Sequence, residues 1–235
     1  MTQLAWLDPS SPFPAPQFAL DEPNGLLAAG GDLSAERILS AYRNGIFPWY
    51  SEGQPILWWS PNPRCIIYPS EVLCSKSLKK HIRKHQPCIT FDQAFEQVIQ
   101  LCARLDSEEG TWITEEMEAA YINLHHLGYA HSVEVWQDHE LVGGLYGLAM
   151  GKVFFGESMF SRQTNASKVA FVSLCRQLEK WGYHLLDCQV ENPHLLSLGA
   201  TTIERNDFLR QLNAALKQSE PSHSWQFDKD LKAYT

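Results

Sequence analysis

The chain has 235 residues, of which 44% are hydrophobic and 20% are charged, and its formal net charge is −8. This length suits one large domain or a small and a medium one, and the composition is that of an ordinary globular protein. No apolar run approaches the roughly 18 residues that span a bilayer, so we expect no membrane segment. The negative charge argues against a protein that coats nucleic acid indiscriminately.

The cysteines and the N-terminus indicate where the protein works. Six cysteines are present without any C-x-x-C spacing, and the first twenty residues lack the basic flank and apolar run of a secretory signal. Both observations favour a reduced, cytoplasmic setting. We expect a monomer, because the sequence contains no coiled coil and no repeated apolar patch.

The first 64 residues differ in composition from the rest. They are rich in Pro, Gly and Trp, and their one clear helix is predicted over 34–44. Gly45 follows this helix, at the position where a left-handed residue commonly ends one. After Arg64 the hydrophobic patterns become regular. We therefore predict a small N-terminal α/β domain over 1–64 and a second domain over 65–235.

A basic run opens the second part of the chain. On a helix, the side chains of Lys76, Lys80, Arg83 and Lys84 share one face through i, i+3 and i, i+4 spacing. Like charges placed together repel one another, so a polyanion is a reasonable partner. The alternative is a solvated helix face without a ligand.

The middle of the chain predicts two helices and an antiparallel meander. Thr90 and Gln93 have the spacing of a capping box before the first helix, and Thr114 can cap the second. Strand-like runs over 131–137, 140–150 and 152–160 are joined by tight turns. A helix over 165–181 and a strand over 183–190 follow. This order is typical of an acetyltransferase-like (GNAT) domain, so we predict an α/β (α+β) fold with a mixed sheet.

Two apolar strands carry a polar side chain near their centres. Asp187 and Gln189 are expected on one face of a strand, and Glu157 lies on the strand that should neighbour it in a right-handed β-α-β unit. Burying such groups without partners is costly, which predicts a cavity at a sheet opening. The alternative is a buried network that only ties strands together. Cys188 should point to the opposite face, into the core.

Other chemistries have weaker support. Cys74, His81, His85 and Cys88 match no common zinc spacing, so no metal site is expected. No G-x-S-x-G elbow is present, and a covalent intermediate is not supported. The many tryptophans of the N-terminal part either stack on nucleobases or join two domains.

Several long motifs, in order, identify the chain as similar to a known family. The resemblance covers about residues 20 to 210, and the family is that of the leucyl/phenylalanyl-tRNA–protein transferases. The segments that carry it are EPNGLLAAGGDL at 22–33, GIFPW at 45–49, WWSPNPR at 58–64, GTWIT at 110–114, FGESMFS at 155–161 and DCQV at 187–190.

The resemblance implies a reaction. Members move leucine or phenylalanine, and less well methionine, from aminoacyl-tRNA to proteins that begin with Arg or Lys, which marks them for degradation by the bacterial N-end rule. It also implies a small N-terminal domain on a GNAT-like domain, with no cofactor.

The resemblance further assigns residues to the donor. Trp49 and Trp112 match the aromatic residues that hold the 3′-terminal adenosine of the tRNA, and the basic run would contact the acceptor stem. The residues that match the pocket for the transferred side chain are Leu145, Phe154, Met159, Leu174 and Leu186. Leu145 and Leu174 stand where Met and Phe are familiar.

The acceptor site is assigned in the same way. Glu157 and Asp187 would form an anionic recess for the basic side chain of the acceptor, and Gln189 would align the attacking amine, with Asp187 orienting its amide. Tyr121 and Asn192 are expected to contact substrate.

Two other functions explain the sequence less well. An acetyl-CoA-dependent acetyltransferase needs a glycine-rich loop before the helix, and residues 162–167 contain no glycine. A non-catalytic RNA-binding module explains the basic run and the tryptophans but leaves Glu157, Asp187 and Gln189 without a role.

Overall fold

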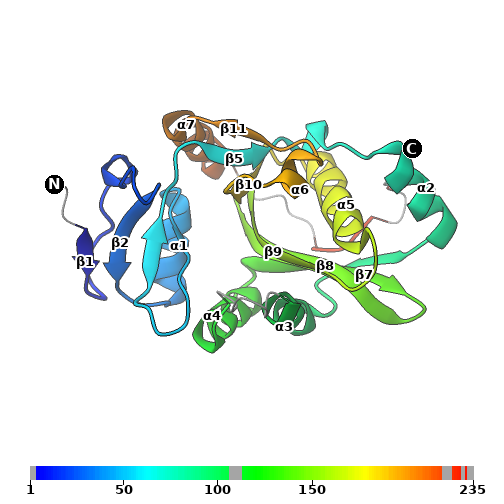
Figure 1. The fold of residues 1–235 in the computed structure, drawn as a ribbon, viewed down its shortest axis with the longest axis horizontal. Coiled ribbons are helices and arrows are strands. Elements are labelled where there is room, and N and C mark those ends of the chain that lie inside the picture. The colour runs from blue at the N-terminus through cyan, green and yellow to red at the C-terminus, as the bar shows by residue number, and fades with distance from the viewer. Residues whose placement is uncertain (1–3, 106–112, 219–223, 229–230, 232–235) are drawn as a thin grey trace.

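The computed structural model describes residues 4–105, 113–218, 224–228 and 231 and contains two β-sheets (Figure 1). The first sheet has the strand order β1-β2-β4-β3 and lies within the N-terminal part, together with helix α1. Its elements are β1 (Ala5–Leu7), β2 (Leu26–Gly30), α1 (Ala35–Arg43), β3 (Phe47–Pro48) and β4 (Leu57–Trp59), with a short 3-10 helix at Pro16–Phe18.

The second sheet is mixed and has the order β11-β5-β10-β9-β8-β7-β6. Its strands are β5 (Arg64–Ile67), β6 (Cys88–Phe91), β7 (Ala130–Gln137), β8 (Glu140–Met150), β9 (Val153–Ser161), β10 (Leu185–Gln189) and β11 (Thr201–Ile203). The helices are α2 (Lys76–His85), α3 (Phe95–Leu105), α4 (Glu115–His126), α5 (Ala166–Lys180), α6 (Pro193–Leu196) and α7 (Arg205–Leu216), with a 3-10 helix at Pro69–Glu71. A mixed α/β fold is therefore confirmed, as are the antiparallel meander β7-β8-β9 and the parallel pairing of β9 with β10.

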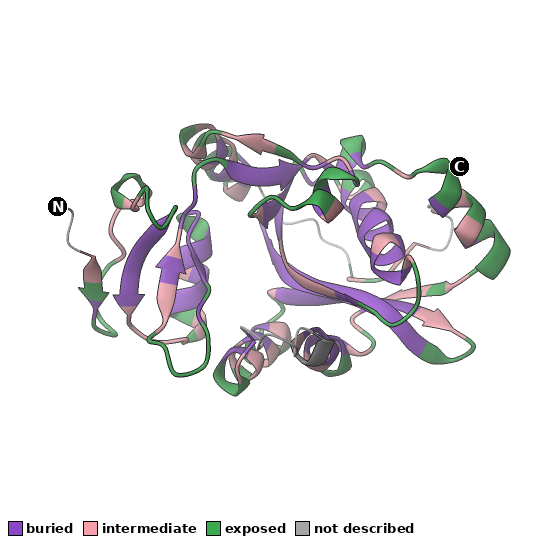
Figure 2. Ribbon diagram, viewed as in Figure 1, coloured by how far each residue is buried: buried purple, intermediate pink, exposed green. Residues whose placement is uncertain are grey.

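Helices cover both faces of the second sheet. α3 and α4 pack on one face and α5 on the other (Figure 1). Figure 2 shows that the central strands and the inner side of α5 are buried. One core cluster joins side chains of the first sheet and α1 to side chains of α3, α4 and the second sheet, among them Tyr42, Trp58, Tyr121 and Phe155. The two sheets thus share one hydrophobic interior.

Local signals explain most helix ends. Ser34 caps α1 by accepting a hydrogen bond from the Arg37 N–H, and Gly45 follows with a φ of 72° that glycine adopts without steric cost. Thr114 caps α4 as expected. The predicted capping box of Thr90 was wrong: Thr90 lies in β6, and its hydroxyl donates to the carboxylate of Glu134 on the neighbouring strand.

Two β-bulges interrupt the second sheet at the same level. On β9, Gly156 and Ser158 pair with consecutive residues of β8, so Glu157 is an extra residue. On β10, Asp187 and Gln189 pair with consecutive residues of β5, so Cys188 is an extra residue. Bulges change the direction of side chains and commonly lie beside functional sites.

The two bulged strands also separate. β9 and β10 pair in parallel from Val153 with Leu185 to Phe155 with Asp187, and the pairing ends there. Gly147 faces the bulge on β9 and needs to be glycine, because a Cβ would lie 2.1 Å from the carbonyl oxygen of Phe155. The sheet opens beyond this point, directly beside both bulges.

Within the part of the chain that the structure describes, no helix is long and apolar enough to cross a membrane. The same residues contain no group of three or more His, Cys, Asp or Glu side chains close enough to hold a metal ion, and Cys74, His81, His85 and Cys88 form no such group.

Candidate active site

A cavity of about 330 Å³ lies where β9 and β10 separate. Its walls come from β8, β9, β10, α5, and β3 with the following residue Trp49. Residues of the first sheet therefore close a cavity that opens in the second.

One part of the cavity wall is apolar. The predicted pocket residues Leu145, Met159, Leu174 and Leu186 all line it. The fifth, Phe154, does not: it is fully buried in the second core cluster, with its ring 5.9 Å from that of Trp225. Phe154 precedes the bulge and keeps the regular alternation of β9, which directs it into the core rather than the cavity.

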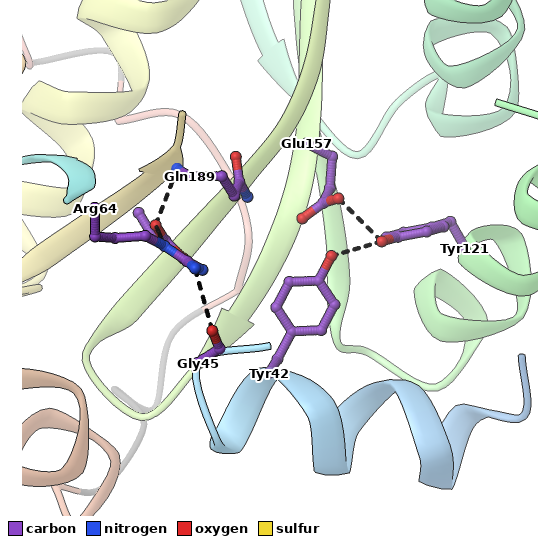
Figure 3. Close-up of polar contacts among 7 residues, drawn as sticks. Tyr42, Gly45, Arg64, Tyr121, Glu157 and Gln189 are labelled. Carbon is purple, nitrogen blue, oxygen red and sulfur yellow. Dashed lines mark hydrogen bonds and ion pairs between the residues drawn. The ribbon is translucent and has the colours of Figure 1, made fainter. Parts of the chain in front are cut away.

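Glu157 brings a carboxylate to the polar part of the wall. Its Oε2 accepts a hydrogen bond of 2.9 Å from the hydroxyl of Tyr121, and the Tyr42 hydroxyl lies 2.7 Å from that of Tyr121 (Figure 3). Because Tyr121 donates to Glu157, it accepts from Tyr42. Burial holds the pKa of both tyrosines well above the usual value, so both remain donors.

The other oxygen of Glu157 has no such partner. Oε1 is buried and makes no hydrogen bond to any residue that the structure describes. Burial raises the pKa of the Glu157 carboxyl from 4.5 to about 7, against the lowering effect of the two tyrosine hydroxyls. A cationic group placed at Oε1 would oppose this effect and favour the ionised carboxylate.

Asp187 does not form part of an anionic recess, and that expectation was wrong. Its carboxylate is fully buried and makes a two-point ion pair with Arg64, with Nε to Oδ1 at 2.8 Å and Nη2 to Oδ2 at 2.7 Å. Arg64 also donates to the Gly45 carbonyl oxygen and lies over the ring of Phe208. The charge of Asp187 is therefore neutralised inside the protein.

Gln189 lines the cavity, and the bulge is the reason that it does not share a face with Asp187. Its φ of 56° turns the chain, and its backbone N–H donates to Asp187 Oδ1 at 3.0 Å. Asp187 thus fixes the backbone of Gln189 and not its amide. The side-chain Nε2 is buried with no hydrogen-bond partner among the described residues. Figure 3 shows Gln189 and Glu157 approaching the same space from neighbouring strands.

The expectation for Cys188 was also wrong in part. Its side chain is only 7% exposed and belongs to the second core cluster, but it lines the cavity as well. As the extra residue of the bulge, it escapes the strict alternation that predicted a core position.

The rim of the cavity carries aromatic and amide groups. Trp49 lines it, is 45% exposed, and has its ring centroid 5.7 Å from that of Trp59. Asn192 lines it too, with its Oδ1 capping the short helix α6 through the Leu195 N–H. Trp112 lies outside the described residues.

The basic run is on helix α2 and lines no part of this cavity. Leu78 and Ile82 anchor α2, while Lys76, Lys80, Arg83 and Lys84 are exposed. Among described residues, none of these four cations has an ion-pair partner. α2 lies at the other end of the second sheet from the first sheet (Figure 1).

Sequence reasoning missed two residues of the site. Tyr42 sits on α1 and reaches Glu157 through Tyr121, and no local pattern predicts that contact. The sequence did carry a signal for Arg64, which is a cation at the start of the apolar strand R-C-I-I. The structure buries all four residues of that strand. A buried arginine requires an anion, and Asp187 was the candidate on an equally apolar strand.

The polar groups of this cavity suit the binding of a charged, hydrogen-bonding ligand. A carboxylate oxygen and an amide N–H, both buried and without a hydrogen-bond partner among the described residues, face a cavity that is apolar over much of its wall. Unsatisfied buried polar groups are costly and rare, and a ligand with a cationic donor and an acceptor would satisfy both.

Comparisons with known proteins identify the family of the chain. Residues 66–213 match the family model described as leucyl/phenylalanyl-tRNA protein transferase, and residues 31–62 match the model of its N-terminal domain. A leucyl/phenylalanyl-tRNA–protein transferase from Hahella chejuensis is 55% identical over the whole of both chains. One from Pseudomonas fluorescens (strain SBW25) is 59% identical, over 92% of this chain and 96% of its own.

Solved structures are less similar. The structure of L-PGS from Bacillus licheniformis matches with a TM-score of 0.40 and 11% identity, over 68% of this chain and 52% of that one, which is too distant to support a conclusion. The sequence relatives and the family models decide the matter: the chain is an aminoacyltransferase that belongs to the leucyl/phenylalanyl-tRNA–protein transferase family.

Proposed function

We propose that this enzyme transfers leucine or phenylalanine, and less well methionine, from aminoacyl-tRNA to the α-amine of proteins that begin with Arg or Lys, and so marks them for N-end rule degradation. One observation carries the proposal: Glu157 Oε1 and Gln189 Nε2 are buried without hydrogen-bond partners among the described residues, beside a cavity with a large apolar wall. The two kinds of wall suit two substrates that meet in one cavity.

The apolar wall would receive the transferred side chain. Leu145, Met159, Leu174 and Leu186 offer only hydrocarbon and thioether contacts, which suit an unbranched Cβ followed by an apolar group. Such a pocket separates side chains that differ by a methylene by only about 1–3 kcal/mol. A preference among Leu, Phe and Met, rather than strict selection, is the expected result.

Glu157 would bind the basic side chain of the acceptor. With Asp187 paired to Arg64, Glu157 supplies the anionic charge at the polar wall. A guanidinium or ammonium group placed at Oε1 would satisfy that oxygen and favour the ionised carboxylate. Tyr121, which accepts from Tyr42, donates to the other oxygen and so leaves Oε1 available to the ligand.

Gln189 would align the attacking amine. An amide is too weak a base to take a proton outright, and an amine with a pKa near 7.7–8.0 is already partly neutral at pH 7. The aminoacyl ester is an activated acyl donor, so direct attack by the amine needs mainly positioning, which can supply several kcal/mol of the barrier. No covalent enzyme intermediate is required.

The donor tRNA would be held at two places. Trp49 and Trp112 would stack on the 3′-terminal adenosine, and base–aromatic stacking contributes about 1–3 kcal/mol per base. Lys76, Lys80, Arg83 and Lys84 would contact phosphates of the acceptor stem. Such contacts make binding salt-dependent and insensitive to tRNA sequence.

The wider setting completes the proposal. The order of helices, meander and parallel-returning strand supports a GNAT-like second domain after a boundary near residue 64, and Arg64 begins the second sheet. Six free cysteines support a reduced cytoplasm as the place of work. We propose that the enzyme acts there as a monomer.

Radiolabelled Leu-tRNA with peptides that begin with Arg, Lys, citrulline or Ala tests the acceptor assignment. Wild type should label the Arg and Lys peptides and leave the two uncharged ones unlabelled. Glu157→Gln should lower kcat/KM with the Arg peptide by a factor equivalent to about 2–5 kcal/mol of transition-state stabilisation. The reason is that it removes one partner of a desolvated charge pair. Equal labelling of Arg and citrulline peptides by wild type would contradict the assignment.

A further inference from the structure

Two cysteines meet across the bulge of β10, directly beside the residues of the site. Cys188 and Gln189 together face Cys65 on β5, since Gln189 pairs with Cys65 and Cys188 is the extra residue. In a β-bulge two residues oppose one residue of the partner strand, so Cys65 neighbours Cys188 as well as its register partner Gln189. Both thiols are free.

The pair lies at the cavity but is shielded from bulk solvent. Cys188 is 7% exposed and lines the cavity, while Cys65 is fully buried behind it. A hydrogen bond from the Cys188 thiol lowers the pKa of Cys65, in contrast to Cys175, whose pKa burial raises far above the usual value. A small oxidant that enters the cavity therefore meets Cys188, whose thiol is hydrogen-bonded to the more acidic thiol of Cys65 behind it.

We propose that Cys65 and Cys188 are a redox-modification site, at which hydrogen peroxide forms a disulfide that stops aminoacyl transfer. One thiolate attacks a peroxide oxygen and becomes a sulfenic acid as the O–O bond breaks and water leaves. The second thiol then attacks the sulfenic sulfur and releases a second water. In sum, two thiols are oxidised, one peroxide is reduced, and a disulfide and two waters form.

The disulfide acts through the backbone of the site. An S–S bond is about 2 Å long, far shorter than a hydrogen bond between two thiols, so the sulfurs must move together. Cys188 would leave the cavity wall, and the bulge that turns Gln189 would change with it. Arg64 precedes Cys65, and Asp187 precedes Cys188. Because these two residues form a buried ion pair that resists movement, the backbone displacement falls on Gln189. A misplacement of 1 Å near reacting groups costs about 10²-fold in rate.

The experiment treats the full-length enzyme with hydrogen peroxide and follows two readouts. Peptide mass spectrometry without reductant should show one species that links Cys65 to Cys188 and lacks two hydrogens. Transfer from Phe-tRNA to an accepted peptide should fall as the linked species accumulates, by about 10²-fold when all of the enzyme is linked. Dithiothreitol should restore it.

Two variants complete the test. Cys65→Ala, which touches no part of the cavity, should transfer normally and keep its activity under peroxide. Cys102→Ala, a matched loss of another buried cysteine, should be inactivated like wild type. The proposal is overturned if wild type loses activity without the linked species, if the species forms and transfer is unchanged, or if Cys65→Ala is inactivated equally. The linkage is read without any assay of acceptor preference, so its absence says nothing against the proposed function.

Discussion

Replacing Glu157 with glutamine should stabilise the free protein at alkaline pH while it weakens the acceptor site. Burial raises the pKa of this carboxyl from 4.5 to about 7. Between those values the unfolded chain has lost its proton and the folded chain has kept it, so the contribution to stability is full below about pH 4.5 and is lost as the pH rises through 7. Glutamine has nearly the same size and no proton to lose, and its oxygen can still accept from Tyr121.

The size of the effect follows from the two pKa values. Because the unfolded chain releases this proton more readily, the raised pKa lowers the unfolding free energy by about 1 kcal/mol at pH 5.5 and about 3 kcal/mol at pH 8. These are upper values, because bound water would lower the cost of the charge. Glu157→Gln should therefore exceed wild type in unfolding free energy by a margin that grows with pH.

Urea unfolding followed by tryptophan fluorescence, at about pH 5.5, 7 and 8, measures that margin. Glu140→Gln is the matched control: it makes the same change at an exposed position at the start of β8, and its effect should be small and independent of pH. A margin for Glu157→Gln that stays constant across the range, or a variant less stable than wild type at pH 8, would refute the reasoning about burial.

Three further outcomes are expected. Asp187→Asn should lower the unfolding free energy by about 3–5 kcal/mol in urea titrations, because it leaves Arg64 charged and buried without its anion; a loss below 1 kcal/mol would show that the pair is unimportant. Lys80→Glu with Arg83→Glu should weaken transfer from tRNA and flatten its salt dependence while sparing a small aminoacyl-adenosine donor, and equal losses with both donors would argue against a stem contact. Gln189→Ala should reduce kcat/KM by about 10²-fold with little change in stability, and an effect of only a few-fold would remove its aligning role.

The sequence predicted the elements well where local signals decide them. Ser34 and Thr114 cap their helices, and the turns of the meander lie where expected, because hydrogen bonds within a few residues determine both. Thr90 was misread for the same reason: the capping pattern was present, but a strand-to-strand contact with Glu134 took its hydroxyl. Local patterns do not report competitors that are distant in sequence.

The site was harder to predict because two bulges reverse the alternation on which the prediction relied. Glu157 and Gln189 were expected at the cavity and line it. Asp187 was expected beside them. The bulge at Cys188 instead directs Asp187 and Gln189 to different faces of β10, and an ion pair with Arg64 neutralises the Asp187 carboxylate. A bulge leaves no clear mark in one sequence, since its cause is the register between two strands rather than either strand alone.

The shared interior of the two sheets limits how this enzyme can vary. Tyr42 and Trp58 from the N-terminal part pack in one cluster with Tyr121 and Phe155, and Phe47 to Trp49 form a wall of the cavity. A fragment that begins after residue 64 would lose that wall and bare a large apolar surface to water. A chimaera that joins the N-terminal part of one relative to the second sheet of a distant relative should therefore be inactive, unless the residues in contact are exchanged as well. The two parts are thus expected to be inherited as one unit.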